Sequence, residues 1–219
     1  MIVGSIKEDL TLEKRVSITP ETAKNIVGLG LKVFIEKNYA SHLGLDDNEY
    51  KNVGVEIKAT SSEVLNSSNL IVKVNCPLEN EINTLKENLI LVGMLNPSKN
   101  KNLISKIIGK KIKPFSLELL PRITRAQSMD VLSSQSNLAG YRAVIDCVAE
   151  FEKAVPMMMT AAGTVPAAKI LVIGAGVAGL QAIATAKRLG AIVSATDVRI
   201  AAKEQVESLG GKFIMVEDD

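Results

Sequence analysis

The sequence predicts an α/β fold with two parallel-sheet domains, the second of which is incomplete in this chain. Two observations support this prediction. Short apolar runs alternate with amphipathic segments from the start of the chain to about residue 120, as strands and helices do in a parallel sheet. A further apolar run, 168–173, then leads directly into a glycine-rich turn and a helix-like segment.

The first domain is predicted from five apolar runs, each short enough to be a single strand. Helix-like segments fill the intervals, which indicates a parallel sheet with helices on both faces. The first helix is expected to begin where Thr19, Pro20 and Glu21 form an N-terminal signal, and to end near Gly28 and Gly30. The predicted strands are 1–6, 31–35, 70–74, 89–95 and 112–117, and further helices are expected at 61–66, 79–87 and 101–109.

The alternation is lost between residues 121 and 135, where a polar stretch precedes a serine-rich one. A helix is expected to start near Ser136 or Asn137 and to run through apolar positions spaced by three and four residues, ending before Pro156. The segments 157–160 and 164–166 then fit a short hairpin. We therefore expect three regions: a first domain at 1–135, a linking helix at 136–155 and the first half of a second domain at 156–219.

The composition argues for a small-molecule partner rather than for nucleic acid. Lys and Arg number 26 against 24 Asp and Glu, so the net charge of +2 provides no broad positive field. Cys76 and Cys147 lie far apart and His42 is the single histidine, so neither a disulfide nor a metal site is expected. The charged residues 7–9 follow the first strand at once and leave no room for an export signal. We expect a cytoplasmic chain.

The glycine-rich turn after residues 168–173 has the spacing GxGxxG, which is typical of the Rossmann-like fold that binds dinucleotides. Gly174 permits the tight turn, Gly176 lets the backbone approach a pyrophosphate, and Gly179 lets the following helix, 180–189, pack closely on the strand. The pyrophosphate would lie at the positive N-terminus of that helix. We expect the cofactor to contact Gly174, Gly176, Val177, Ala178 and Gly179.

The residues beyond the turn favour NAD over NADP. The next predicted strand, 191–196, ends at Asp197, about where an acidic residue accepts hydrogen bonds from the adenosine ribose. A carboxylate there disfavours the 2′-phosphate of NADP because the charges repel each other. Arg199 leaves alternatives open, since an arginine can bind a 2′-phosphate, stack on adenine or lie on the surface. We expect NAD(H) as the cofactor, with Asp197 and Arg199 in its site.

The second domain is expected to be incomplete because its strands are few. A dinucleotide-binding domain of this type needs about six parallel strands. From residue 168 onward three strands can be counted, at 168–173, 191–196 and 212–216.

Three further stretches are more specific than the glycine turn as evidence for a particular protein family. They are Leu117–Asp130, Ser133–Val144 and Met157–Pro166. Together with the turn they closely resemble the α subunit of proton-translocating NAD(P) transhydrogenases, and the resemblance covers the whole chain. On this basis the chain is identified as a member of the alanine dehydrogenase/transhydrogenase family, similar to its amino-terminal, NAD(H)-binding region.

The resemblance implies an enzyme that transfers hydride between two nicotinamide nucleotides. In this family a peripheral domain binds NADH and passes hydride directly to NADP⁺ on a separate domain, while a membrane domain couples the exchange to proton translocation. The implied partners are the NADP-binding subunit or domain, the membrane domain and a second copy in a homodimer. The implied location is cytoplasmic, peripheral to the inner membrane through these partners. Hydride transfer needs two rings held face to face, so no acid, base or nucleophile is expected here.

The resemblance also implies which side chains hold the nicotinamide end of the cofactor. The matching positions are Arg122, Gln127, Asp130 and Ser133, and Tyr141 matches a tyrosine placed near the nucleotide. Taken without the resemblance, Arg122 and Asp130 fit an ordinary surface ion pair. Ser133 then fits a helix cap, and Tyr141 fits a core position on a helix face.

Two alternatives remain open. Alanine dehydrogenase has the same two-domain plan, and Arg15 and Lys73 match its substrate-binding arginine and lysine, but Asn96 stands where that enzyme has a catalytic histidine. Because asparagine cannot exchange a proton near neutral pH, amino-acid oxidation is not expected. The other alternative is a non-catalytic fragment that binds NAD or assists assembly, which the small number of strands in the second domain motivates.

Overall fold

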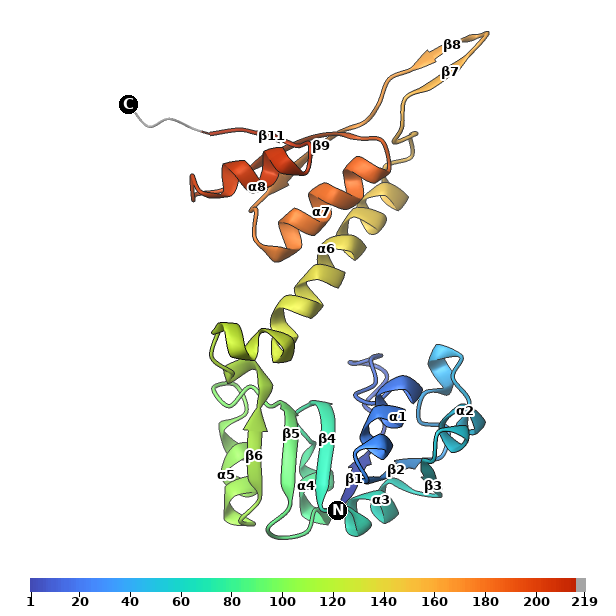
Figure 1. Cartoon of the computed structure of the whole chain (residues 1–219), viewed down its shortest axis with the longest axis vertical. Helices are drawn as coiled ribbons and strands as arrows, with labels where there is room; N and C mark the ends of the chain where they lie inside the picture. Colours follow the sequence, from blue (N-terminus) through green and yellow to red (C-terminus); the bar gives the residue numbers. More distant parts are fainter. Residues whose placement is uncertain (216–219) are drawn as a thin grey trace. The chain divides into compact units, whose positions relative to one another are not determined.

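The computed structural model describes residues 1–215, and the contacts between Cα atoms divide the chain into two compact units, Met1–Met129 and the region from Asp130 onward (Figure 1). Each unit contains a parallel sheet with helices packed against it, so the predicted α/β fold with two parallel sheets is confirmed. Within residues 1–215, no helix combines the length and the apolar character needed to cross a membrane.

The first unit contains six parallel strands in the order β3-β2-β1-β4-β5-β6. The strands are β1 Ile2–Ser5, β2 Lys32–Glu36, β3 Glu56–Lys58, β4 Leu70–Asn75, β5 Ile90–Met94 and β6 Lys113–Ser116. The α-helices are α1 Pro20–Gly28, α2 Asp47–Asn52, α3 Ser61–Ser67, α4 Glu79–Thr84 and α5 Lys101–Gly109. Short 3-10 helices lie at η1 Ser41–Leu43, η2 Leu117–Leu119 and η3 Thr124–Met129.

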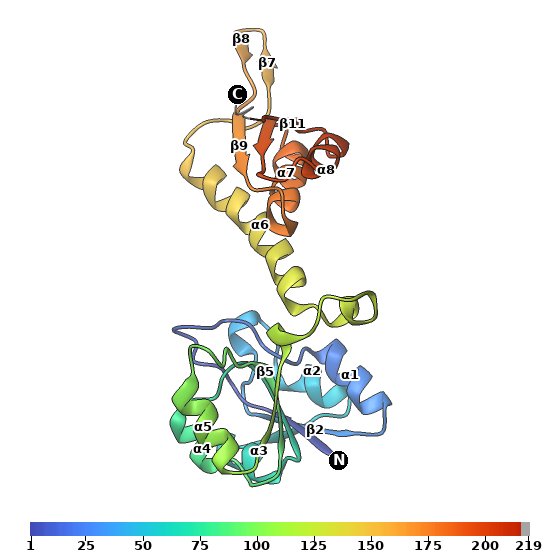
Figure 2. The same ribbon diagram turned by 90° about the vertical axis from the view of Figure 1, so that its left-hand side faces the viewer.

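Both faces of this sheet carry a core because successive strand residues point to opposite sides. On one face Phe34, Ile71 and Leu91 pack in a cluster with residues of α3, α4 and α5. On the other face Val33 and Ile35 pack with residues of α1 and α2. Figure 2 shows α4 and α5 on one side of the strands and α1 on the other. The predicted arrangement of helices on both faces is therefore present.

The prediction for this unit omits two short elements, β3 and α2. Strand β3 has a single apolar residue, Ile57, between Glu56 and Lys58, so no apolar run marks it. Helix α2 has six residues and buries Tyr50 alone among them, and its start depends on the Asp46 side chain, which accepts backbone N–H groups of the first turn. Neither element is long enough to show a hydrophobic period.

The second unit contains a parallel sheet of three strands in the order β11-β10-β9 within the described residues. Ile183 and Ala186 of α7 and Val193 and Ala195 of β10 form the centre of its core. The predicted strand 212–216 is observed as β11, and Val216 lies outside the described residues. The elements are α6 Val131–Glu150, β7 Met158–Thr160, β8 Gly163–Val165, β9 Lys169–Ile173, α7 Val177–Arg188, β10 Ile192–Thr196, α8 Ala202–Ser208 and β11 Lys212–Phe213.

Helix α6 begins earlier than predicted, at Val131 rather than near Ser136 or Asn137, and ends at Glu150. Its N-cap is Asp130, whose side chain accepts the backbone N–H of Ser133. The polar, serine-rich character of this stretch indicated a loop, but a capping carboxylate makes the same residues a helix start. The predicted start of the linking helix is therefore wrong.

Strands β7 and β8 form the predicted short hairpin, an antiparallel pair in which Met158 lies opposite Val165. All the residues of both strands are exposed. The hairpin therefore presents apolar side chains outside the core of its unit.

Candidate dinucleotide site

The glycine-rich turn joins β9 to α7 and has the geometry that its sequence predicts. Gly174 adopts a φ of +96°, a conformation that side chains disfavour, and its N–H donates to the carbonyl of Thr196 at 2.8 Å. A Cβ at Gly179 would lie 1.7 Å from the carbonyl oxygen of Gly174, so only glycine fits there. A Cβ at Gly176 would meet nothing within 4 Å, which leaves this side of the turn open to a ligand.

The first turn of α7 offers backbone N–H groups at this open side. Gly176 is the N-cap and has no side chain to accept hydrogen bonds from Val177, Ala178 or Gly179. The first N–H groups of any helix lack partners within the helix, and the helix dipole makes this end positive. The arrangement can bind a phosphate group, although the role of each residue as a cofactor ligand stays a prediction.

Asp197 follows β10 and ties the end of that strand to the glycine turn. Its Oδ2 atom accepts the backbone N–H of Ala175 at 2.7 Å. Its Oδ1 atom accepts the backbone N–H of Arg199 at 2.8 Å and the Nε–H of the same residue at 3.0 Å. These hydrogen bonds, above all those from the Arg199 side chain, hold the pKa of Asp197 well below its ordinary value. Asp197 is therefore a fixed negative charge beside the turn.

A cavity of about 570 Å³ lies at the carboxyl ends of β9 and β10. Parallel sheets place ligand sites at this edge, and cavities of this size bind small organic molecules. Val198 is fully exposed and Ile200 is 66% exposed, so apolar surface is available for a flat ring. The lining residues are Ile173, Gly174, Thr196, Asp197, Val198, Ile200 and Met215.

The five residues expected to hold the nicotinamide belong to both units. Arg122 and Gln127 lie in the first unit, and both are exposed. Arg122 lies just before η3 and Gln127 lies within it. In the second unit the structure brings Asp130 and Ser133 together, because Asp130 Oδ2 accepts the Ser133 hydroxyl at 2.7 Å and Oδ1 accepts the Ser133 N–H at 2.9 Å. Tyr141 is 49% exposed on α6, so it is not a plain core residue. Their binding roles stay predictions.

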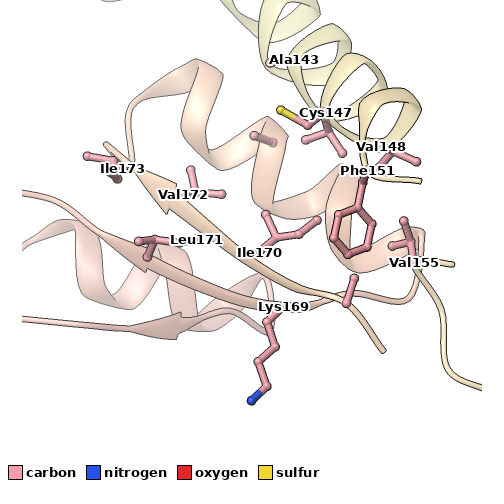
Figure 3. A pocket seen from close by; sticks show the side chains of 13 residues that line it. Ala143, Cys147, Val148, Phe151, Val155, Lys169, Ile170, Leu171, Val172 and Ile173 are labelled. Atoms are coloured by element: carbon pink, nitrogen blue, oxygen red, sulfur yellow. The ribbon is translucent and has the colours of Figure 1, made fainter. Parts of the chain in front are cut away.

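A second hollow in the same unit was not predicted from the sequence. It has a volume of about 310 Å³. Figure 3 shows Cys147 and Val148 of α6 and Phe151, the residue after its end, on one side and β9 on the other, with Lys169 directed away. The sequence signals that could have found it are the apolar spacing of α6 near its end and the apolar run that becomes β9. In the structure Leu171 of that strand remains 57% exposed. Its walls are almost wholly apolar, so it is unsuited to a phosphate.

Arg15 and Lys73 of the first unit are engaged by carboxylates of the chain itself. Lys73 is buried, and its Nζ atom lies 2.8 Å from Glu81 and 3.5 Å from Glu8. The guanidinium of Arg15 lies 2.7 Å from Glu13. The resemblance to alanine dehydrogenase matches these two cations to a substrate site. The structure instead pairs both of them with carboxylates of the same chain.

Asn96 follows β5 with a φ of 45°, and its N–H donates to Glu118 at 2.6 Å. The asparagine therefore lies at the carboxyl edge of the first sheet, in the place expected from the sequence, and its side chain supplies no titratable group.

Comparisons with known proteins agree with this architecture. The family model "Alanine dehydrogenase/PNT, N-terminal domain" matches residues 4–139, and "Alanine dehydrogenase/PNT, C-terminal domain" matches residues 143–219. A protein of Rhodospirillum rubrum, named as the first portion of NAD(P) transhydrogenase subunit alpha, is 51% identical over 224 residues, which cover 100% of this chain and 58% of that protein. The chain thus spans little more than half the length of this curated relative.

Two further relatives place the similarity within the family. The structure of transhydrogenase from Sinorhizobium meliloti superposes with a TM-score of 0.94 at 51% identity, covering 98% of this chain and 64% of that one. An alanine dehydrogenase of Methanococcus maripaludis is 32% identical over 201 residues, covering 90% of this chain and 53% of that protein. The sequence identity is therefore higher to the two proteins named transhydrogenase than to the alanine dehydrogenase.

Proposed function

The chain belongs to the alanine dehydrogenase/PNT family, and on this premise we propose that it is the NAD(H)-binding component of an NAD(P) transhydrogenase. The observation that supports the proposal most is the glycine turn locked to Asp197 through the N–H of Ala175 at 2.7 Å. This arrangement pairs an open phosphate-binding turn with a fixed carboxylate beside a cavity, as an NAD site requires. The 51% identity to a transhydrogenase subunit supports the choice of reaction.

The proposed cofactor is NAD(H), with NADP(H) bound by a partner domain. The pyrophosphate would bind at Gly176 and the first N–H groups of α7, and the adenosine ribose would approach Asp197. The lowered pKa of Asp197 keeps this carboxylate ionised, which opposes a 2′-phosphate through charge repulsion. Arg199 offsets some of that charge, so it is the residue that tunes the preference.

NADH supplies the hydride in the proposed reaction, and the chain supplies position rather than acid or base groups. Arg122, Gln127, Asp130, Ser133 and Tyr141 are proposed to hold the nicotinamide end. The hydrogen bonds between Asp130 and Ser133 fix two of these side chains before a ligand arrives. Such preorganisation lowers the entropy that must be lost when the ring is oriented.

The proposed partners are the NADP-binding domain, a membrane domain that couples hydride transfer to proton translocation, and a second copy of this chain. Membership of a multi-subunit complex agrees with the name of the Rhodospirillum rubrum relative, which denotes one portion of a divided alpha subunit. A homodimer agrees with the exposed hairpin, in which Met158 is 50% and Met159 is 73% exposed. The proposed location is cytoplasmic, peripheral to the inner membrane through these partners.

The test is to titrate the chain with NADH by fluorescence and then to add the NADP-binding partner with an NADP analogue. Reduction of the analogue by NADH supports the proposal. Binding without transfer at any ratio of partners would favour the non-catalytic alternative instead. Pyruvate-dependent oxidation of NADH would favour an alanine dehydrogenase, which the internal pairing of Arg15 and Lys73 and the presence of Asn96 argue against.

A further inference from the structure

Gly140 lies near the middle of α6 and is buried, although glycine costs a helix interior about 1 kcal/mol relative to alanine. The structure gives a reason for this glycine. A Cβ at position 140 would lie 2.1 Å from the carbonyl oxygen of Ala178 and 2.8 Å from its carbonyl carbon. These are backbone atoms, so no side-chain rotation could relieve the overlap. Gly140 therefore allows α6 to lie directly against the first turn of α7.

The first turn of α7 is consequently held in backbone contact on two sides. On the side of the strand, the missing side chain of Gly179 makes room for the carbonyl of Gly174. On the side of α6, the missing side chain of Gly140 makes room for the carbonyl of Ala178. Figures 1 and 2 both show α6 alongside α7. Two glycines far apart in the sequence, Gly140 and Gly179, thus define where this turn lies.

We propose that Gly140 is a positioning residue of the dinucleotide site. It sets the separation between α6 and the first turn of α7, and through it the position of the N–H groups that face the pyrophosphate. This inference rests on the proposed function. A side chain at residue 140 forces the two helices apart, and the N–H groups of Val177 and Ala178 move with their helix. Tyr141 follows Gly140 directly, so the same displacement reaches this proposed nucleotide contact.

The adenosine end of the site provides an internal reference. It is formed by Asp197 and the end of β10, and Asp197 contacts the turn at Ala175, whereas Gly140 meets Ala178 between α6 and α7. A displacement at Gly140 should therefore weaken ligands that carry the pyrophosphate more than it weakens adenosine. A loss of stability alone would not change the ratio of the two affinities.

The experiment uses the full chain with Gly140→Ala and measures the affinity for NADH by fluorescence and for adenosine by NMR titration. We expect the affinity for NADH to fall at least about tenfold, or 1.4 kcal/mol, and that for adenosine to change less than about twofold. Gly109→Ala is the matched control, because Gly109 ends α5 and a Cβ there meets nothing within 4 Å. It should change neither affinity.

Val144→Ala provides a second comparison, since it removes core packing from α6 without adding an atom toward Ala178. It should lower Tm and leave the ratio of affinities unchanged. An unchanged ratio in Gly140→Ala would overturn the inference and leave the proposed function intact, because the parent chain would still bind NADH. Absence of NADH binding by the parent chain would overturn both.

Should Gly140→Ala fail to fold, amide hydrogen exchange of the parent chain replaces it. NADH should slow exchange in α6 around Gly140 as well as in the first turn of α7. Slowing in α7 alone would overturn the inference, because α6 would then have no role in holding the turn.

Discussion

The Asp197 carboxylate accepts the backbone N–H of Ala175 at 2.7 Å, and by this hydrogen bond the end of β10 holds the turn between β9 and α7. The same carboxylate accepts hydrogen bonds from the backbone and the side chain of Arg199. One residue thus orders the phosphate-binding turn and supplies a negative charge at the edge of the cavity. These two roles can be separated by mutation.

Asp197→Asn should reduce discrimination between NADH and NADPH more than it reduces NADH affinity. The amide oxygen can still accept the N–H of Ala175, whereas the charge that repels a 2′-phosphate is gone. We expect the ratio of the two affinities to shift toward NADPH by about tenfold, or 1.4 kcal/mol. Fluorescence titration of both nucleotides measures it. Asp146→Asn, an exposed residue paired with Arg142 on α6, is the control, and an equal shift there would contradict the assignment.

Gly179→Ala should destabilise the second unit and abolish NADH binding. The added methyl group would lie 1.7 Å from the carbonyl oxygen of Gly174, and overpacking of this kind typically costs about 1–3 kcal/mol. Urea unfolding compares the variant with Gly28→Ala, in which the methyl group meets nothing within 4 Å. Equal midpoints for the two variants would show that the close approach at Gly179 is not needed.

Glu8 should make folding stability depend on pH. Burial raises the pKa of this carboxyl above its ordinary value, and the charge of Lys73 offsets the effect only incompletely because Glu81 lies closer to that lysine. Folding therefore favours the protonated acid, and its contribution is complete below about pH 4 and is lost as pH rises through the raised pKa. Glu8→Gln keeps this position neutral at every pH.

The measurement for Glu8 is Tm against pH for the parent and for Glu8→Gln. The difference between the two should be near zero at pH 4 and should turn in favour of the variant by pH 7. A difference that stays constant, or that favours the parent at pH 7, would show that the pair with Lys73 outweighs burial.

Met159→Glu should dissociate the proposed homodimer without altering NADH affinity. Met159 is 73% exposed on the hairpin, and a charge there opposes burial against a second copy. Analytical ultracentrifugation at several concentrations measures the change. Leu29→Glu, at a position 78% exposed in the first unit, is the control and should leave the dimer intact. A parent chain that is monomeric at all concentrations would contradict the proposed dimer.

The fold follows from the sequence where the signal is local. Strands β1, β2, β4, β5 and β6 could be predicted because each lies in a short segment rich in apolar residues, and the glycine turn carries its own spacing. Strand β3 escapes prediction because Ile57 stands alone between two charged residues. The start of α6 was not predicted because it depends on a hydrogen bond, from the Ser133 N–H to the Asp130 side chain, that the residue types alone do not indicate.

The candidate site is only partly predictable from sequence, for a physical reason. Gly174, Gly179 and Asp197 belong to a motif with fixed spacing, so their geometry could be anticipated. The contact between Gly140 and Ala178 joins residues that lie far apart in the sequence, and it depends on how two helices pack. The pairing of Lys73 with Glu8 and Glu81 likewise depends on the fold of the first unit.

The most direct test of the account is the transfer of hydride from NADH, bound to this chain, to an NADP analogue on the NADP-binding partner. The chain and the partner are mixed at several ratios, and reduction of the analogue is followed by absorbance. Reduction should require both proteins, and Asp197→Asn should slow it at low NADH concentration. NADH binding that is absent, or reduction that proceeds equally well without this chain, would contradict it.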